Sequence, residues 1–272
     1  MSGLPGDGVG DTWSLTVPYR ARFDECGTDD LVRSSAFLRY AQDVAWIHSE
    51  RLGFTRAWYT ERNLGWVVRT AELAVLAPLR LGEVIAMRTE VVGFRRFWAR
   101  RLTEGRLSDG TLVISGQTDW VIIDTTRGMP GRLPPEFLAR FDRRTPAFEP
   151  GRVALPPAPG NGVHETVLRV RPQDADPMGH MNNAAYLDFL EETLLDAGDR
   201  AAALARAIPR RFRLEYLLPA APGSSLSSRI WTPQRDGDGA DAADRAWLLA
   251  DEDGRKVARG LVMREGNAPD RS

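Results

Sequence analysis

Cysteine and lysine are almost absent from this chain, and a long apolar run is absent altogether. Cys26 is the only cysteine and Lys256 the only lysine among 272 residues. A single cysteine excludes an internal disulfide and a cysteine-based metal cluster, so we expect Cys26 to be inert. No apolar run approaches the roughly 20 residues that cross a bilayer, so no membrane partner is expected. The first residues lack the basic and apolar segments of a secretory signal, which predicts a cytoplasmic protein.

An excess of one charge is lacking as well. The chain has 36 lysines and arginines against 37 aspartates and glutamates, a net charge of −1, so no nucleic-acid partner is expected. The absence of a G-x-S-x-G sequence argues against a serine hydrolase of the α/β class. Glycine-rich loops that bind phosphate or dinucleotides are absent too. We expect neither a cofactor nor a metal.

Proline and glycine are concentrated in one internal stretch, residues 145–162 (TPAFEPGRVALPPAPGNG). This composition predicts an extended linker, which divides the chain into an N-terminal domain over 12–144 and a C-terminal domain over 163–265. Each domain begins with a strand and a polar loop. A helix pattern follows, over 34–53 in the first domain and 183–205 in the second, and then four strand-like runs.

The two domains repeat the same landmarks in the same order. Three pairs match, at offsets of 149, 141 and 144 residues: Arg20-x-Arg22 with Arg169-x-Arg171, Gly82 with Gly223, and Asp109-Gly110 with Asp253-Gly254. The falling offset places extra residues in the first copy, within 53–66. This duplication predicts an α+β fold of two tandem domains, each an antiparallel sheet wrapped around a long helix. We expect the copies to pair edge to edge as a pseudo-dimer, and a homodimer of whole chains stays an open alternative.

One loop carries the residues that we expect to do chemistry. The segment 169–192 (RVRPQDADPMGHMNNAAYLDFLEE) joins a strand to the second helix and holds Asp176 and His180. Asn182 and Asn183 follow at the positions of a helix N-cap. The N–H groups and the dipole of a helix N-terminus stabilise a developing oxyanion. The loop therefore predicts a hydrolytic site.

Water attack on a thioester needs a base, oxyanion donors and a site that excludes solvent, but no metal. His180 or a nearby carboxylate would be the base. At 100° per residue, Glu191 falls at the border of the inward stripe of the second helix. It is interpreted either as a catalytic acid–base or as a partly buried structural carboxylate. His48, on the inward face of the first helix, is expected to serve packing.

The motif D-x-D-x-x-G-H-x-N-N-x-x-Y-x-x-x-x-E, residues 174–191, resembles the signature of hotdog thioesterases. The tandem layout and the segment 119–141 (DWVIIDTTRGMPGRLPPEFLARF) resemble the acyl-ACP thioesterases of plants and bacteria. The resemblance implies two tandem hotdog domains that hydrolyse fatty acyl chains from acyl carrier protein (ACP). It further implies that Asp176 and His180 are catalytic and that the first domain selects the acyl chain.

The chain departs from the plant enzymes at two positions. Met178 stands where they carry an asparagine, and Pro219 lies in the segment after Leu214-Glu215-Tyr216 where they carry a catalytic acid. Glu191 is therefore an alternative acid. At the same register, the first copy has Gly27, Leu31 and Gln42 in place of Asp176, His180 and Glu191, so we expect one working site per chain.

Four arginines, Arg95, Arg96, Arg100 and Arg101, gather within eight residues. They are interpreted as a solvated strand edge that discourages aggregation, or as a docking patch for the acidic acyl carrier protein. Two functions compete with acyl-ACP hydrolysis: an acyl-CoA thioesterase of the same fold, and a non-catalytic acyl-binding protein. A hotdog dehydratase ranks last.

Overall fold

The computed structural model describes residues 12–141, 147–233 and 244–264. The expected domain boundary at 144–145 and the expected end at 265 lie outside these residues. The helices are α1 (Ser34–Arg51), α2 (Arg56–Glu61), α3 (Pro135–Leu138), α4 (Asn183–Asp196) and α5 (Asp199–Arg206), with 3-10 turns η1 (Phe23–Glu25) and η2 (Pro172–Asp174). The strands are β1 (Ser14–Arg20), β2 (Leu64–Val75), β3 (Val84–Arg95), β4 (Trp98–Arg106), β5 (Leu112–Asp124), β6 (Met129–Pro130), β7 (His164–Arg169), β8 (Arg210–Tyr216), β9 (Ser225–Trp231), β10 (Arg245–Ala250) and β11 (Lys256–Arg264).

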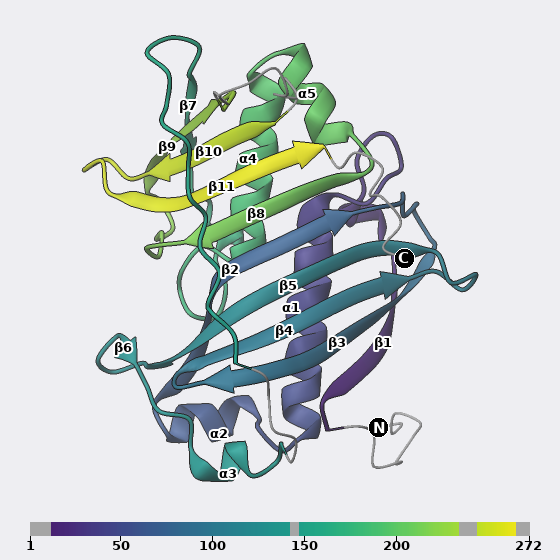
Figure 1. Ribbon diagram of the computed structural model, residues 1–272, viewed down its shortest axis with the longest axis vertical. Helices are drawn as coiled ribbons and strands as arrows, with labels where there is room; N and C mark the ends of the chain where they lie inside the picture. Colours follow the sequence, from purple (N-terminus) through teal and green to yellow (C-terminus); the bar gives the residue numbers. More distant parts are fainter. Residues whose placement is uncertain (1–11, 142–146, 234–243, 265–272) are drawn as a thin grey trace.

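One antiparallel sheet runs through the whole molecule (Figure 1). Its strand order is β1-β3-β4-β5-β2-β8-β11-β10-β9-β7, with β6 paired to β5 outside this path. The first five strands belong to the N-terminal half and the last five to the C-terminal half. The halves join where β2 pairs with β8, in a register that runs from Thr70↔Glu215 to Val75↔Arg210. The predicted edge-to-edge pairing within one chain is therefore confirmed.

The long helices α1 and α4 lie on the same face of the sheet, one behind each half (Figure 1). In α1 the inward stripe consists of Phe37, Tyr40, Ala41, Val44 and His48, and all five are buried. Apolar residues at this helical spacing drive the sheet to wrap around the helix. The fold is thus the expected pair of tandem hotdog units. Among the described residues, no helix is long and apolar enough to cross a membrane.

The repeat register deduced from the sequence holds in the structure. Helices α1 and α4 begin 149 residues apart, at Ser34 and Asn183. Gly82 and Gly223 both adopt positive φ, 84° and 89°, in the turn that precedes an equivalent strand of each half. Positive φ is a conformation that glycine adopts without steric cost. The glycines at these landmarks therefore mark the same turn in each copy.

The helix predicted over 183–205 is wrong in its continuity. The structure has two helices, α4 and α5, separated at Ala197 and Gly198. The φ of Gly198 is 94°, and a glycine with positive φ just after a helix is a common terminator. The apolar periodicity continues across this break because both helices pack on the same core.

The described part of the linker, from residue 147 to β7, contains no helix or strand. It crosses the face of the sheet opposite α1 and α4 (Figure 1). Two buried carboxylates hold it there: Asp119 accepts from the Gly151 N–H at 2.6 Å, and Glu215 accepts from the Val153 N–H at 2.9 Å. Glu215 also pairs with Arg259 at 2.7 Å. The linker is thus packed onto both halves.

Candidate active site

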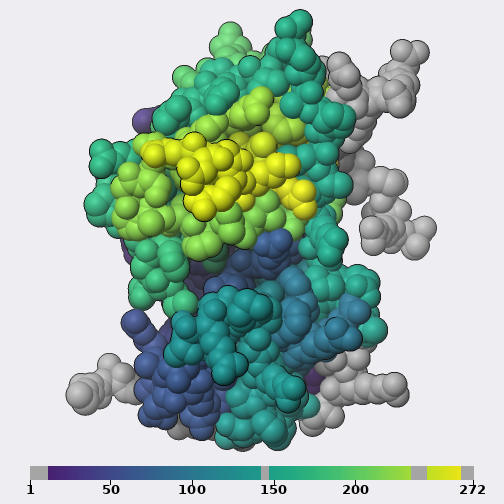
Figure 2. Space-filling view, turned by 90° about the vertical axis from the view of Figure 1, so that its left-hand side faces the viewer, coloured from purple at the N-terminus to yellow at the C-terminus, as the bar shows by residue number. Residues whose placement is uncertain are grey.

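A cavity of about 840 Å³ lies between α1 and the first half of the sheet and reaches the loop before α4. A large part of its wall is apolar or aromatic: Ala45, Trp46, Leu64, Trp66, Val91, Phe94, Ala99, Trp120 and Phe137. Charged residues also line it: Arg39, Asp43, Glu50, Arg56 and Arg101. Its other end is formed by Asp176, Pro177 and Met178 of the second half. Figure 2 shows the side where the blue residues of the first half meet the green residues of the second, with a hollow at their junction. The cavity therefore belongs to both halves.

The extra residues of the first copy build much of this cavity. Segment 53–66 supplies Tyr59 from α2 and Leu64, Gly65 and Trp66 from β2. The first half also has the longer elements: α1 has 18 residues against 14 in α4, and β2 has 12 against 7 in β8. The unequal repeat lengths seen in the sequence thus correspond to an enlarged cavity in one half.

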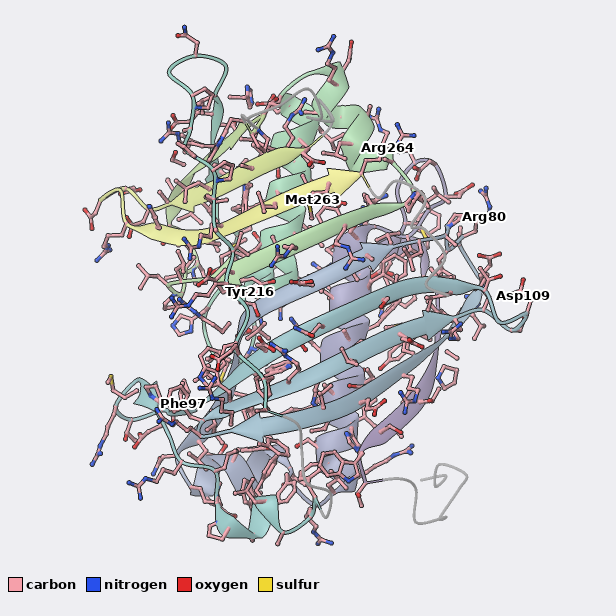
Figure 3. All side chains as sticks on the ribbon, in the orientation of Figure 1. Arg80, Phe97, Asp109, Tyr216, Met263 and Arg264 are labelled. Carbon is pink, nitrogen blue, oxygen red and sulfur yellow. The ribbon has the colours of Figure 1, made fainter. Side chains whose placement is uncertain are left out.

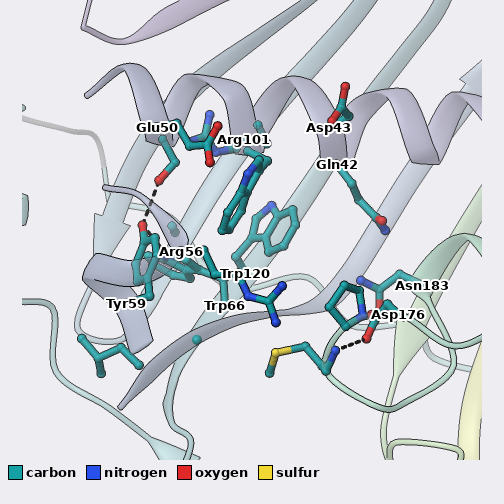
Figure 4. A pocket seen from close by; sticks show the side chains of 18 of the residues that line it. Gln42, Asp43, Glu50, Arg56, Tyr59, Trp66, Arg101, Trp120, Asp176 and Asn183 are labelled. Carbon is teal, nitrogen blue, oxygen red and sulfur yellow. Dashed lines mark hydrogen bonds between the residues drawn. The ribbon is translucent and has the colours of Figure 1, made fainter. Parts of the chain in front are cut away.

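At the mouth of the cavity, the loop from Asp176 to His180 is closed on itself by hydrogen bonds. The Met178 N–H donates to Asp176 Oδ1 at 2.8 Å, and the Asp176 N–H donates to the His180 carbonyl at 2.9 Å. Gly179 has a φ of 79°, which permits this tight turn. One carboxylate oxygen of Asp176 is therefore engaged by the loop, while the residue remains part of the cavity wall (Figure 4).

The start of α4 is the next part of the mouth. Asn182 caps the helix, because its Oδ1 accepts from the Ala184 N–H at 2.9 Å. Its Nδ2 donates to Gln42 Oε1 of α1 at 3.1 Å, which links the two halves. Asn183 is the first helical residue and also lines the cavity. The N–H of a first helical residue has no acceptor within its helix, so this position is suited to bind an oxyanion.

His180 lies beside this mouth but is exposed and does not line the cavity. The strand end that follows Tyr216 flanks the same loop: the Met181 N–H donates to the Ala220 carbonyl at 2.8 Å, and the Tyr186 hydroxyl donates to the Leu218 carbonyl at 3.4 Å. The segment in which the plant enzymes carry their catalytic acid is therefore close to this loop. In this chain Pro219 lies in that segment, and proline has no titratable side chain.

Glu191 does not meet Asp176. It lines a second cavity of about 240 Å³, together with Gly27 and Leu31 of the first copy's loop. Its Oε1 lies 3.6 Å from Nη2 of Arg210, and burial raises the pKa of its carboxyl group. The expected grouping of Asp176, His180 and Glu191 in one site is therefore not what the structure shows.

The pseudo-twofold relation between the halves explains this separation. Each copy's loop faces the long helix of the other copy, so the Asp176 loop faces Gln42 and the Gly27 loop faces Glu191. Gln42 is thus a residue of the site, although the sequence predicts it only as the first copy's counterpart of Glu191. The signal was present, since Gln42 and Glu191 share one register position and a hotdog pair places that position opposite the partner's loop.

The four clustered arginines do not form one surface. Arg95 pairs with Glu149 at 2.6 Å, and Arg96 is exposed with a φ of 56°. They lie next to Phe97, at the end of the sheet opposite the Asp109 turn (Figure 3). Arg100 forms two hydrogen bonds with the buried Asp119, at 2.7 and 2.8 Å, and Arg101 lines the cavity. Of the four, only Arg95 and Arg96 are exposed.

No group of three or more histidine, cysteine, aspartate or glutamate side chains that could hold a metal ion occurs in the part of the chain that the structure describes. Two fused hotdog units, with an apolar cavity that ends at a helix N-terminus and a carboxylate, define a thioesterase of the hotdog class. The chain belongs to the acyl-ACP thioesterase family: its N-terminal domain pattern matches residues 14–141 and its C-terminal domain pattern matches residues 160–247. It is a thioester hydrolase of fatty acyl-ACP.

Relatives of known sequence and structure cover most of the chain. An uncharacterized protein of Mycobacterium tuberculosis is 25% identical over 217 residues, which cover 79% of this chain and 81% of the relative. The 12:0-ACP thioesterase from Umbellularia californica has a TM-score of 0.74 at 20% identity, covering 94% of this chain and 98% of that one. An acyl-ACP thioesterase from Bacteroides thetaiotaomicron has a TM-score of 0.74 at 18% identity, covering 93% and 98%. These structures share the tandem hotdog fold.

Proposed function

We propose that the chain releases fatty acids from acyl carrier protein with the acyl tail in the 840 Å³ cavity and the thioester at its mouth. One observation carries this arrangement: the apolar cavity of the first half ends at Asp176 and at the start of α4. An apolar cavity binds an alkyl chain through burial, and a helix N-terminus beside a carboxylate suits the reacting carbonyl. The first domain, 12–144, would then select the chain and the second, 163–265, would carry the chemistry.

The reaction follows from the groups at the mouth. The carboxylate of Asp176 orients a water molecule, and Asp176 or the neighbouring His180 accepts its proton as the oxygen attacks the thioester carbon. The Asn183 N–H donates to the oxyanion of the tetrahedral intermediate. The carbon–sulfur bond then breaks, the thiolate takes up the proton, and a free fatty acid remains. Gln42 holds Asn182, and thereby the helix start, in place.

Turnover of a matched series of acyl-ACPs tests this proposal, with the acyl-CoAs of the same chains measured in parallel. Wild type is expected to hydrolyse acyl-ACP with the higher kcat/KM. Asp176→Asn should lower kcat by about 100-fold or more, and His180→Ala by about 10- to 1000-fold, without a change in melting temperature. Wild-type kcat in both variants would contradict the placement of the thioester at Asp176.

Three further features stay predictions. The acidic surface of acyl carrier protein is proposed to dock at the exposed Arg95 and Arg96. A cytoplasmic location and a homodimer of whole chains are inferred from the sequence alone. Charge reversal at Arg95 and Arg96 should weaken turnover of acyl-ACP while sparing that of acyl-CoA, and equal loss on both would contradict docking at these residues.

A further inference from the structure

A charged side chain occupies a core position of strand β4. Side chains of a strand alternate between its two faces, and in β4 the inward residues Ala99, Thr103 and Gly105 are buried. Arg101 lies on this same inward face and lines the large cavity. Its neighbour Arg100 lies on the outer face, under the linker. An arginine thus stands in a row of core residues, opposite α1.

The guanidinium of Arg101 contacts an imidazole ring and a hydroxyl group. Its Nη1 lies 3.0 Å from Nδ1 of His48 and 3.4 Å from the Thr89 hydroxyl, which accepts from it. Arg100, by contrast, is fully matched by the carboxylate of Asp119. Over residues 12–141, 147–233 and 244–264, no carboxylate forms an ion pair with Arg101. Asp43 and Glu50 of α1 also line the cavity, but both are exposed.

An uncompensated positive charge beside apolar walls is costly, and proteins normally pair or neutralise such a group. Burial lowers the pKa of Arg101 to about 10, so it remains protonated at neutral pH. In the described part of the chain, its Nε and Nη2 have no hydrogen-bond acceptor. Two neighbouring N–H groups of a guanidinium match the two oxygens of a carboxylate. An anionic oxygen group would satisfy both of these donors.

The location of Arg101 tells which part of a substrate it would meet. In Figure 4, Arg101 and Asp176 lie at opposite ends of the pocket, with Trp66 and Trp120 between them in this view. A chain whose thioester reacts at Asp176 passes the aromatic wall before it reaches Arg101. The guanidinium would thus contact the end of the acyl chain that is remote from the thioester.

We propose that this cavity accepts acyl chains that carry a carboxylate at the end remote from the thioester, and that Arg101 binds that carboxylate. This inference rests on the proposed function, because it takes Asp176 as the place of the thioester. Aromatic and aliphatic residues bind the methylene segment, and Arg101 determines specificity for the far end. An unsubstituted chain would leave the guanidinium without a counter-ion, which weakens its binding.

The test compares two series of ACP thioesters over chain lengths of about 6 to 16 carbons: unsubstituted monocarboxylic chains and mono-thioesters of the dicarboxylic acids. Wild type is expected to favour the dicarboxylic series by about tenfold or more in kcat/KM at the best length. Arg101→Leu should reverse this preference. Arg106→Leu, an exposed arginine of the same strand, should keep it. Arg101→Gln serves as a second variant if Arg101→Leu does not fold.

A binding measurement separates failure of this inference from failure of the proposed function. Quenching of the cavity tryptophans by free dicarboxylic and monocarboxylic acids reports the ligand class without turnover. Hydrolysis of unsubstituted chains with no dicarboxylic preference in wild type would overturn the inference and leave the function intact. If wild type hydrolyses neither series but binds the dicarboxylic acids, and Arg101→Leu abolishes this binding, the proposed thioester hydrolysis is wrong and the inferred dicarboxylic ligand is supported. Equal quenching by both acids would overturn the inference.

Discussion

The buried pair of Glu191 and Arg210 provides a sharp test of whether Glu191 is structural. Arg210 Nη2 lies 3.6 Å from Glu191 Oε1 and donates to the Ser34 hydroxyl at 2.7 Å, and its Nη1 donates to the Ala207 carbonyl at 2.6 Å. The side chains are only 7% and 14% exposed. At this separation two charges attract by about 4–5 kcal/mol at an effective dielectric constant of about 20. Arg210→Met removes the cation and leaves Glu191 buried.

The expected loss of unfolding free energy is about 3 kcal/mol at neutral pH, since removing one partner of a buried ion pair typically costs about 3–5 kcal/mol. Burial raises the folded-state pKa of Glu191, and Arg210 opposes that rise, so the substitution raises the pKa further. A carboxyl group with a raised folded pKa stabilises the fold fully below its unfolded pKa of about 4.3. That stability is lost as the pH rises through the folded pKa, by about 1.4 kcal/mol for each pKa unit.

Urea denaturation of wild type and Arg210→Met at about pH 5 and about pH 7.5 measures this effect. The destabilisation caused by the substitution should be smaller at the lower pH. When Arg210→Met is introduced into Glu191→Gln instead of wild type, the destabilisation that it causes should be the same at both pH values, because the titrating carboxyl group is gone. In the wild-type background, a destabilisation by Arg210→Met that is equal at both pH values would refute this reasoning.

Since Glu191 lines the smaller cavity, folded Glu191→Gln should keep a kcat within about threefold of wild type. A 100-fold loss of kcat would show that Glu191 is catalytic.

Two more predictions concern the mouth of the large cavity. Asn182→Ala removes the cap of α4 and the bond to Gln42; urea denaturation should show a loss of about 1 kcal/mol, and acyl-ACP assays a kcat reduced by about tenfold. Gly179→Ala meets no atom within 4 Å but forces alanine to a φ of 79°, at a cost of about 1–2 kcal/mol, and should also lower kcat. Gly110→Ala, at a φ of 89° in a remote turn, should cost the same stability with unchanged kcat.

The sequence was sufficient to predict the fold because its signals are local and repeated. Alternating strands, two inward helix stripes and turn glycines at matched offsets each depend on neighbouring residues. The duplication then implied how the copies would pair, and the β2–β8 ladder confirms it. The motif also placed Asp176, Asn182 and Asn183 around one helix start, where the structure has them lining one cavity.

Local signals do not predict which residues share a site, because the site combines the loop of one copy with the long helix of the other. The motif predicts Glu191 beside the loop of its own copy, but the pseudo-twofold relation turns it toward the loop of the other copy. Arg100 and Arg101 illustrate a second limit. Adjacent strand residues point to opposite faces, but two identical residues give no indication of which one is inward. The apolar pattern does not predict the break at Gly198, because both helices share one apolar face.

The 840 Å³ cavity and its 240 Å³ counterpart show what joining the two copies in one polypeptide allows. In an assembly of identical subunits, a substitution that widens one acyl cavity widens every other. Here the inserted residues 53–66 enlarge one side only, while the opposite side keeps a closely packed ion pair. Titration with a tight-binding acyl analogue should therefore saturate at one molecule per polypeptide.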